Sequence, residues 1–432
     1  MSNHSAFTVI RRRKGYAGLF LAGIINGIGD RFSQVAMLSL LLNLTGSGMA
    51  VGLTMGLRIV PYLLLAPVGG MLASKLSRKA IMVAADLLRV PFALSFLLVR
   101  SAEDVWIVYA ASMALAAGEA LYAPVRKSAV PLLVKLEELL AVNGLEQALT
   151  GCVLVIGAVT GGAVSLWLGS SWAFILNALS FLTTAGVIYR INFTPLNKEE
   201  GTKGQADAKQ MKTQDSNRAS YTSLGALIAG SLVVQIALGF ELLVPLFNGL
   251  ENVLISVYAI QVFGAGDLGV GLMYGAIGTG LILSMFAGRF IDKGRKAVIW
   301  GAMGCLMLEG ILMILMSAAP ALWTACGIYL VLTFAGGVGN ACLDTALMRE
   351  LPEQRQGPMF GLLAALGGAL MGLSMLGAGV LLEWFDPRTV GRLGGLGYAA
   401  SALLLALYWF VGRGHARRKE REEKPLPSSP TR

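Results

Sequence analysis

The chain has 432 residues, of which 55% are hydrophobic, 54 are glycine and only 14% are charged. Ordinary soluble domains carry roughly 25% charged residues, and a mean hydropathy of +0.67 is too high for a water-soluble protein of this size. These figures exclude a set of soluble domains and indicate an all-α polytopic membrane protein. The net charge of +10 does not indicate a nucleic-acid partner, because the basic residues form short clusters between apolar runs.

Twelve apolar runs follow one another along the chain, and a membrane-spanning helix needs about 20 such residues. The first run is too long for the apolar part of a cleaved signal peptide. A polar stretch separates six runs from the next six. We therefore predict an N-terminal six-helix half (1–190), a cytoplasmic linker (191–220), a C-terminal six-helix half (221–412) and a basic cytoplasmic tail (413–432). The runs lie near 16–42, 49–73, 80–99, 105–124, 145–168, 172–189, 238–262, 268–288, 297–317, 321–343, 359–382 and 393–412.

The segment 221–262 is apolar for too long to be one span, and polar residues and Pro245 interrupt it. Two spans here would place the next basic cluster on the wrong side of the membrane. We predict one span, preceded by a short helix that lies in the cytoplasmic interface.

The basic residues predict the orientation of the chain. With the N-terminus in the cytoplasm, 29 of the 35 Lys and Arg residues fall in cytoplasmic segments, and three fall on the outer side. Because cytoplasmic loops of membrane proteins are enriched in Lys and Arg, we expect both termini to lie in the cytoplasm. We expect the protein itself to lie in the plasma membrane.

The cysteines and histidines of the chain do not indicate a disulfide, a metal site or a catalytic pair. The four cysteines lie inside apolar runs without paired spacing, and the two histidines, His4 and His415, lie near the ends of the chain. No metal-ligand cluster, no nucleophile with a base and no phosphate-binding loop appears. We expect no cofactor, no metal site and no enzymatic activity, and any energy must come from a gradient or a partner.

The two halves resemble each other. Gly70-Met-Leu-Ala-Ser-Lys-Leu-Ser-Arg-Lys-Ala80 follows the second run, and Gly288-Arg-Phe-Ile-Asp-Lys-Gly-Arg-Lys-Ala297 follows the eighth. Further on, Gly118-Glu-Ala and Pro131 recur as Gly339-Asn-Ala and Pro352, both at an offset of 221 residues. A duplicated six-span unit is typical of secondary transporters, which bind substrate between their repeats.

The segment 70–79 resembles the loop motif of the major facilitator superfamily. Within it, the chain is similar to the macrolide-efflux and enterobactin-exporter branch. The resemblance implies twelve transmembrane helices in two six-helix halves and transport by alternating access. The residues that carry the closer match are Gly29-Asp30, Leu57-Arg58-Ile59-Val60-Pro61, Ala85-Asp86-Leu87-Leu88-Arg89, Ala123-Pro124-Val125-Arg126, Asn143-Gly144-Leu145, Leu351-Pro352 and Phe360-Gly361.

Three positions depart from the family pattern. Ser74 stands where the loop motif usually has Asp, although the second copy keeps its acid as Asp292. Ala114 stands where many proton-coupled exporters have an arginine in span four, and Ala158 stands where the span-five motif has proline. The glycines of that motif, Gly157, Gly161 and Gly162, remain and are expected to allow close helix packing.

A polar face on the first span indicates a cavity. Gly23, Asn26, Gly27, Asp30 and Gln34 recur at intervals of three and four residues and therefore share one side of a helix. An ionisable group inside a span is expensive and is a functional candidate by default.

Depth along the helices gives a first map of the charged groups. Counting about 1.5 Å per residue, Asp30 and Arg58 lie at similar depths, so we expect them to pair, and Glu119 and Glu251 complete one layer. We predict that these four and Asn26 bind substrate or couple transport to protons; the alternative is a structural salt bridge between spans one and two. Two other groups favour structural roles: Asp86 with Arg89 as an ion pair, and Glu309 as a partner for a neighbouring helix.

The loop motifs are the predicted gates. Their basic residues are expected to pair across the halves and to hold the cytoplasmic side shut in the outward-open state; the alternative is that they only set topology. The predicted gating residues are Gly70, Ser74, Arg78, Lys79, Gly288, Asp292, Arg295 and Lys296.

The sequence favours a secondary transporter that exports a small amphipathic or cationic organic compound in exchange for protons, as a monomer in the lipid bilayer. The alternatives are a lysophospholipid or siderophore transporter of the same fold and a membrane receptor that does not transport. The carboxylates in the first half favour a cationic or proton-coupled substrate over a lipid, and the internal repeat disfavours a receptor.

Overall fold

A computed structural model describes residues 6–45, 53, 54, 56–168, 170–193, 224–287, 291 and 294–422. Six long helices form the first half, and most of their residues are apolar, as expected of helices that face lipid or one another. A short helix, α1 (Ala6–Arg12), precedes them. The six are α2 (Lys14–Thr45), α4 (Ile59–Lys75), α5 (Arg78–Ser95), α6 (Val105–Leu133), α7 (Leu139–Leu168) and α8 (Ser170–Arg190).

Six more long helices form the second half, after a short helix, α10 (Leu224–Gly230). A π-helical turn, Tyr258–Val262, ends the first of them. The six are α11 (Leu232–Val257), α12 (Gly266–Ser284), α13 (Arg295–Ser317), α14 (Leu322–Glu350), α15 (Glu353–Trp384) and α16 (Pro387–Glu422).

The prediction of an all-α polytopic membrane protein is confirmed, and the twelve long helices in the described ranges are compatible with the predicted count of spans. Within the described ranges, nine helices are long and apolar enough to cross a membrane, and Ile59–Lys75 and Gly269–Ser284 are shorter apolar helices; α2 is the twelfth. The segment 221–262 contains one long helix, as predicted. It begins earlier than expected, because the Ser231 hydroxyl caps it by accepting from the Val234 amide at 3.4 Å.

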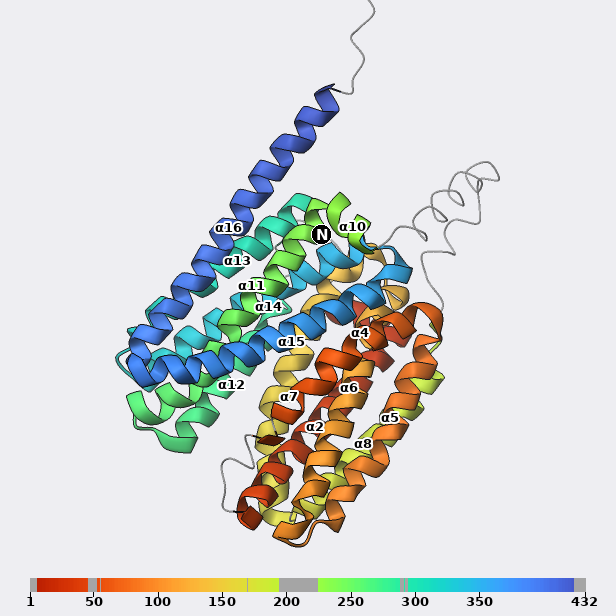
Figure 1. Cartoon of the computed structure of the whole chain (residues 1–432). Helices are drawn as coiled ribbons and strands as arrows, with labels where there is room; N and C mark the ends of the chain where they lie inside the picture. Colours follow the sequence, from red (N-terminus) through yellow and green to blue (C-terminus); the bar gives the residue numbers. More distant parts are fainter. Residues whose placement is uncertain are drawn as a thin grey trace, which may run out of the picture.

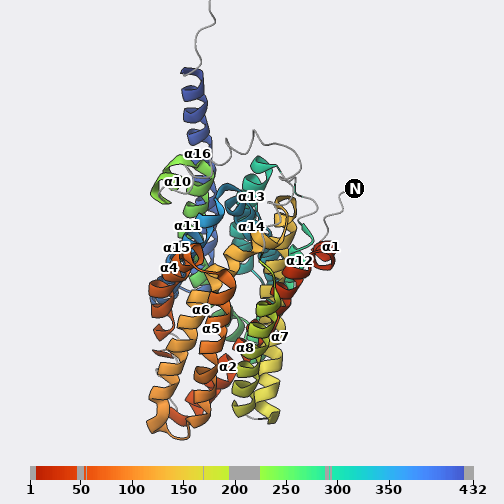
Figure 2. The same cartoon turned by 90° about the vertical axis from the view of Figure 1, so that its right-hand side faces the viewer.

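The two ends of the second half differ from the prediction. Most of the expected linker, and the last ten residues of the expected tail, lie outside the described residues. Helix α16 continues to Glu422, ten residues past the predicted end of the second half. The extension consists largely of Arg, Lys, Glu and Ala, which are good helix formers, so nothing in the sequence ends the helix at the membrane. Figure 2 shows α16 projecting beyond the other helices.

The helices of each half pack against one another and against the other half. In the first half α2 packs against α7 and α8, and α5 packs against α6 and α8; in the second, α13 packs against α14 and α16, and α11 against α15 and α16. The halves meet where α4 lies along α15 and where α7 lies along α12. Figure 1 shows the red-to-yellow half and the green-to-blue half as two groups joined along these helices.

The halves are closed against each other at one end, which we call the basic end. There α4 ends at Lys75, α5 begins at Arg78 and α15 begins at Glu353. A Cβ added to Gly70 of α4 would lie 2.2 Å from the Gly357 carbonyl oxygen of α15. The two backbones therefore touch, with no side chain between them.

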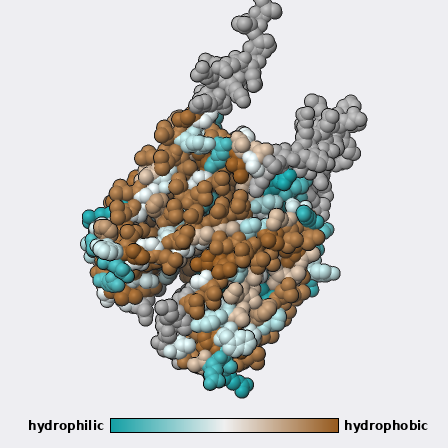
Figure 3. Space-filling model, viewed as in Figure 1, coloured by the Kyte–Doolittle hydropathy of each residue, from teal (hydrophilic) through white to brown (hydrophobic). Residues whose placement is uncertain are grey.

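The surface is hollowed between the halves on the side away from the basic end (Figure 3).

The polar contacts between the halves gather near the basic end. Arg78 pairs with Glu353, and the Arg349 guanidinium donates to the Leu136 carbonyl oxygen at 3.3 Å. Most of the visible surface is hydrophobic, with hydrophilic residues at the ends of the bundle. The molecule is therefore closed at the basic end and opens toward the opposite end.

Replacing Gly70 by alanine is expected to force the basic end apart. The new methyl group would meet backbone atoms, which cannot rotate away, so the halves must separate and transport should fall at least tenfold. Gly186→Ala on α8 is the matched control, because a Cβ there meets nothing within 4 Å. Distances between spin labels at the exposed positions Lys75 and Gln354 measure the separation. Equal distances in wild type and Gly70→Ala would contradict this account.

Candidate functional site

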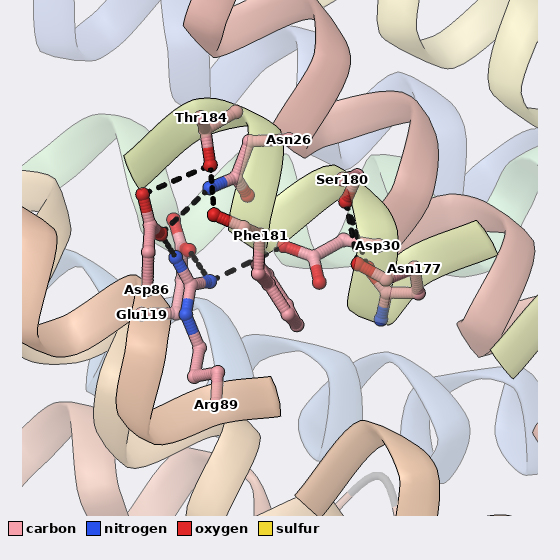
Figure 4. Close-up of polar contacts among 9 residues, drawn as sticks. All are labelled: Asn26, Asp30, Asp86, Arg89, Glu119, Asn177, Ser180, Phe181 and Thr184. Atoms are coloured by element: carbon pink, nitrogen blue, oxygen red, sulfur yellow. Dashed lines mark hydrogen bonds and ion pairs between the residues drawn. The ribbon is translucent and has the colours of Figure 1, made fainter. Parts of the chain in front are cut away.

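A buried arginine, Arg89 of α5, lies at the centre of three carboxylates in the first half. Its side chain is only 1% exposed. Its Nη2 donates to Asp86 Oδ1 at 2.5 Å, and its Nη1 donates to Glu119 Oε2 at 2.8 Å and to Asp30 Oδ2 at 3.4 Å. Figure 4 shows the carboxylates of α2, α5 and α6 gathered around one guanidinium. One cation therefore ties three helices together, and carboxylates outnumber it.

The fold makes room for Arg89 at one glycine. A Cβ on Gly118 of α6 would lie 2.5 Å from Arg89 Cγ, so the arginine stem occupies the space that a side chain would fill. The rings of Tyr122 and Phe181 lie 5.3 and 4.3 Å from the guanidinium carbon. Aromatic faces stabilise a cation that has lost its water, so this pocket is shaped to hold an arginine.

Asp86 is the fixed member of the cluster. Its side chain is fully buried and accepts hydrogen bonds from Asn26 Nδ2 at 3.0 Å and Thr184 Oγ1 at 2.9 Å, as well as from Arg89. The predicted pair of Asp86 with Arg89 is confirmed as an i,i+3 ion pair. Asn26, predicted to act in transport, donates to Asp86 and lines the same pocket as Asp30 and Glu119.

Asp30 and Glu119 are the two carboxylates of the cluster that solvent can reach. Each side chain is 30% exposed, and both depend on the same nitrogen, Arg89 Nη1. Both line two connected pockets, one of about 180 Å³ and a smaller one that also includes Arg58. A single donor shared by two accessible carboxylates can move toward either when the other is neutralised.

The predicted pairing of Asp30 with Arg58 is wrong. The structure pairs Asp30 with Arg89, and Arg58 makes no hydrogen bond or ion pair to any residue in the described ranges. Arg58 occupies the N-cap position of α4 but makes no side-chain cap hydrogen bond, and the described residues 53, 54, 56 and 57 before it are also helical. Depth along a helix placed Arg58 correctly beside the small pocket of Asp30 and Glu119, but it ignored Arg89, whose long side chain reaches from a third helix.

Glu251 does not join this layer. It is buried within the second half, where the Tyr398 hydroxyl of α16 lies 2.9 Å from Glu251 Oε2 and 2.5 Å from Asn248 Oδ1. Depth fixes the level of a residue but not the side of the helix from which it projects. Glu309 is also buried, and its carboxylate lies against Gly336 of α14, a neighbouring helix as predicted, although it makes no polar contact with any described residue.

A chain of polar cavities continues from this cluster toward the basic end. One cavity of about 240 Å³ lies between α6, α7 and α14, and the next, of about 250 Å³, lies between α6, α7, α11 and α14. Adjacent cavities share lining residues: Glu119 and Arg126 belong to two of them, and Lys127 and Asp344 to two. The charged residues that line the two larger cavities are Glu119, Arg126, Lys127, Glu146, Glu241 and Asp344.

Two ion pairs of these cavities were not predicted from the sequence. Lys127 Nζ lies 2.6 Å from Asp344 Oδ1 and joins the two halves, while Arg126 pairs with Glu146 inside the first half. Arg126 and Lys127 are among the 29 basic residues that the predicted topology places in cytoplasmic segments. Helix α6 runs on to Leu133 through Pro131, so both residues lie within the helix. The signal was available in Ala123-Pro124-Val125-Arg126, which carried part of the family resemblance.

The predicted basic gates divide into two kinds. Arg78 crosses the halves: its Nη1 lies 3.2 Å from Glu353 Oε1, and its Nη2 donates to the Glu353 carbonyl oxygen at 3.2 Å. Lys79 stays within the first half and donates to the Tyr189 carbonyl oxygen at 2.8 Å. The prediction of pairing across the halves therefore agrees with the structure for Arg78 and is wrong for Lys79, which points along α5 toward α8.

The other predicted gate positions are less informative. The Ser74 hydroxyl is exposed and donates to the Met71 carbonyl oxygen of its own helix at 2.7 Å, so it cannot replace an acid as a partner for a cation. Lys296 is exposed at the start of α13. Gly288, Asp292 and the side chain of Arg295 lie outside the described residues.

Small residues allow two close approaches of α7. A Cβ on Gly157 would lie 2.8 Å from Arg31 Cβ of α2, and one on Gly151 would lie 2.4 Å from the Gly278 carbonyl oxygen of α12. Gly161 and Gly162 are in α7, but their surroundings lie outside the described residues. Within the described ranges, no group of three His, Cys, Asp or Glu residues is placed to hold a metal ion.

Two curated relatives are similar in sequence. Macrolide efflux protein A of Streptococcus pyogenes is 27% identical over 259 residues, which are 57% of this chain and 62% of that protein. The match therefore spans less than two thirds of the relative's length. The MFS-type transporter YfiS of Bacillus subtilis (strain 168) is 22% identical over 390 residues, which are 87% of this chain and 88% of YfiS.

A solved structure and a family model identify the fold. The human organic anion transporter MFSD10 superposes with a TM-score of 0.74 at 17% identity, over 92% of this chain and 99% of that chain; at this identity the likeness shows the fold alone. The sequence model of the Major Facilitator Superfamily matches residues 19–373 and 250–432. The family model covers more than half of the chain, and the described ranges contain twelve long helices. The chain therefore belongs to the Major Facilitator Superfamily and is a membrane transporter, not an enzyme.

Proposed function

We propose that this transporter exports a small amphipathic or cationic organic compound by exchange for protons. Its similarity to a protein named for macrolide efflux supports export. The acid-rich lining of the cavities supports a cationic or proton-coupled substrate, since buried carboxylates bind cations and protons.

One observation carries the proton coupling: Asp30 and Glu119 share Arg89 Nη1 and both line the cavity. When one carboxylate binds a proton, it loses its attraction for the guanidinium, and Arg89 Nη1 moves toward the other. Asp86 holds Nη2 throughout, so the arginine pivots and does not leave. A proton thus changes the contacts between α2, α5 and α6, which shape the cavity.

The orientation follows from the basic end. We infer that it faces the cytoplasm of a plasma membrane, because the Lys and Arg clusters gather there. The groove of Figure 3 would then open to the outside, and Arg78 with Glu353 would close the inside. Residues 191–220 would be a cytoplasmic linker between halves 1–190 and 221–412, the segment 413–432 a basic tail on the anionic inner leaflet, and the protein a monomer in the bilayer.

A drug-susceptibility panel in an efflux-deficient host would first identify a compound to which the chain confers resistance. That compound should then accumulate in everted membrane vesicles when respiration acidifies their interior. The accumulation should disappear when a protonophore collapses the gradient, because an exchanger draws its energy from protons. Accumulation that is unaffected by the protonophore would contradict proton exchange, and absence of any gradient-driven accumulation would contradict export.

A further inference from the structure

A lysine of the first half occupies an ammonium site built by the second half. Lys127 Nζ lies 2.6 Å from Asp344 Oδ1 of α14 and 4.9 Å from the centre of the Phe360 ring of α15. A carboxylate beside an aromatic face is the arrangement that recognises organic ammonium groups. The side chain of Lys127 therefore shows which chemical group this place accepts.

A third recognition group lies in the same cavity. Glu241 of α11 lines the cavity of about 250 Å³ together with Asp344 and Lys127. Lys127 neutralises Asp344 at 2.6 Å, whereas Glu241 forms no ion pair or hydrogen bond with any described residue. Its Oε2 lies beside Gly367, 3.6 Å from where a Cβ would stand. The cavity thus contains one more carboxylate than ammonium groups.

The walls of this cavity suit the apolar part of such a ligand. Beside the charged groups and amides, it is lined by Phe240, Val244, Pro245 and Leu343. Apolar walls with a few placed polar groups are typical of small-molecule sites. An amphipathic amine or quaternary ammonium compound matches both parts of the lining.

We infer that Asp344, Phe360 and Glu241 form the binding site for the cationic group of the substrate, and that Lys127 takes the place of this group when the basic end closes. The inference rests on the proposed function; it narrows the substrate to compounds with an organic ammonium group and adds the residues that hold this group. Lys127 belongs to the half that moves away when the basic end opens, so its departure frees Asp344.

The arrangement gives a reason for release. While the basic end is open, a substrate ammonium group would contact both Asp344 and Glu241. As the halves close, Lys127 binds Asp344 and leaves the substrate with Glu241 alone, on the side that opens outward. The same ion pair that joins the halves therefore weakens the hold on the substrate.

Fluorescent probes that differ in one charge test this inference on the purified protein, without any gradient. Trimethylammonium-diphenylhexatriene carries the ammonium, and diphenylhexatriene is its uncharged parent. Lys127→Gln should raise the affinity for the charged probe roughly tenfold, since it removes a charged competitor. Asp344→Asn should lower it by a similar factor, and Glu241→Gln should lower it in both the wild-type and the Lys127→Gln background.

The two variants of the ion pair separate competition from simple loosening. Lys127→Gln and Asp344→Asn break the same contact between the halves, so loosening alone would shift affinity in the same direction for both variants and for both probes. Shifts in opposite directions, confined to the charged probe, would support the inference. Glu241→Gln breaks no pair among the described residues, so it tests the site even where Asp344→Asn fails to fold.

Three results would overturn the inference: equal shifts for Lys127→Gln and Asp344→Asn, equal effects on both probes, or no preference for the charged probe in either the wild-type protein or Lys127→Gln. Failure of the proposed function would look different. Binding would follow the expected pattern while vesicles showed no proton-driven accumulation.

Discussion

Replacing Arg89 by methionine is expected to remove most of the folded protein from the membrane. The change leaves Asp86, Glu119 and Asp30 together without their shared cation. Breaking a buried ion pair by removing one partner costs about 3–5 kcal/mol. A whole domain is stable by only about 5–15 kcal/mol, so this one change consumes a large part of the stability of the first half.

Two further variants identify the cause. Arg58→Met removes an arginine of the small pocket that Asp30 and Glu119 line; Arg58 makes no ion pair with the described residues, so this change should leave the protein abundant. Adding Asp86→Asn to Arg89→Met should restore part of the loss, because Asp86 is the carboxylate with no access to solvent. Membrane abundance and the thermal unfolding of purified protein are the measurements. Normal abundance of Arg89→Met would show that the cluster does not stabilise the fold.

Replacing Asp30 by asparagine is expected to abolish proton-driven transport and leave the protein intact. Asn resembles a permanently protonated Asp, so a carrier with this change can bind compound and exchange it across the membrane. It cannot accumulate compound against a gradient. Because Arg89 keeps Asp86 and Glu119 as partners, Asp30→Asn leaves no unpaired buried cation, and abundance should stay near that of the wild type.

Three measurements on the Asn variant decide the matter: membrane abundance, counterflow exchange, and proton-driven uptake into everted vesicles. Driven uptake should fall to that of vesicles without the protein, while exchange persists. Ser180→Ala on α8 is a useful control, because its hydroxyl lies beside this part of α2 but bonds only to Asn177 among the contacts of Figure 4. Normal driven uptake by Asp30→Asn would assign coupling to Glu119 or to Glu251.

The sequence predicts the fold well because a membrane simplifies the problem. Each span must be apolar for about 20 residues, so α5, α8 and α13 lie within a few residues of the predicted runs. Errors arose where this constraint is weak. Helix α11 begins at a serine cap inside a long apolar stretch, and α16 continues beyond the predicted span because its charged extension still favours a helix.

The candidate site was predicted only in part. Intramembrane charge identified Asp30 and Glu119, and the structure brings them together around one nitrogen. Their partner was misassigned, since spacing along a helix does not say how far a side chain such as Arg89 reaches. Lys127 and Glu241 were overlooked because one was counted as a loop residue and the other as an interruption of a span. Only the three-dimensional arrangement of α6, α11 and α14 around one cavity brings them together.

The close backbone contacts between the halves separate mechanical from chemical roles. Gly70 touches Gly357 and Gly151 touches Gly278 through main-chain atoms, which form a bearing surface along α4 with α15 and α7 with α12. The described polar residues of the two larger cavities project from α6, α7, α11 and α14. The side chains that determine substrate specificity can therefore change during evolution while these backbone contacts stay the same. Relatives with different substrates can then share one relative motion of the two halves.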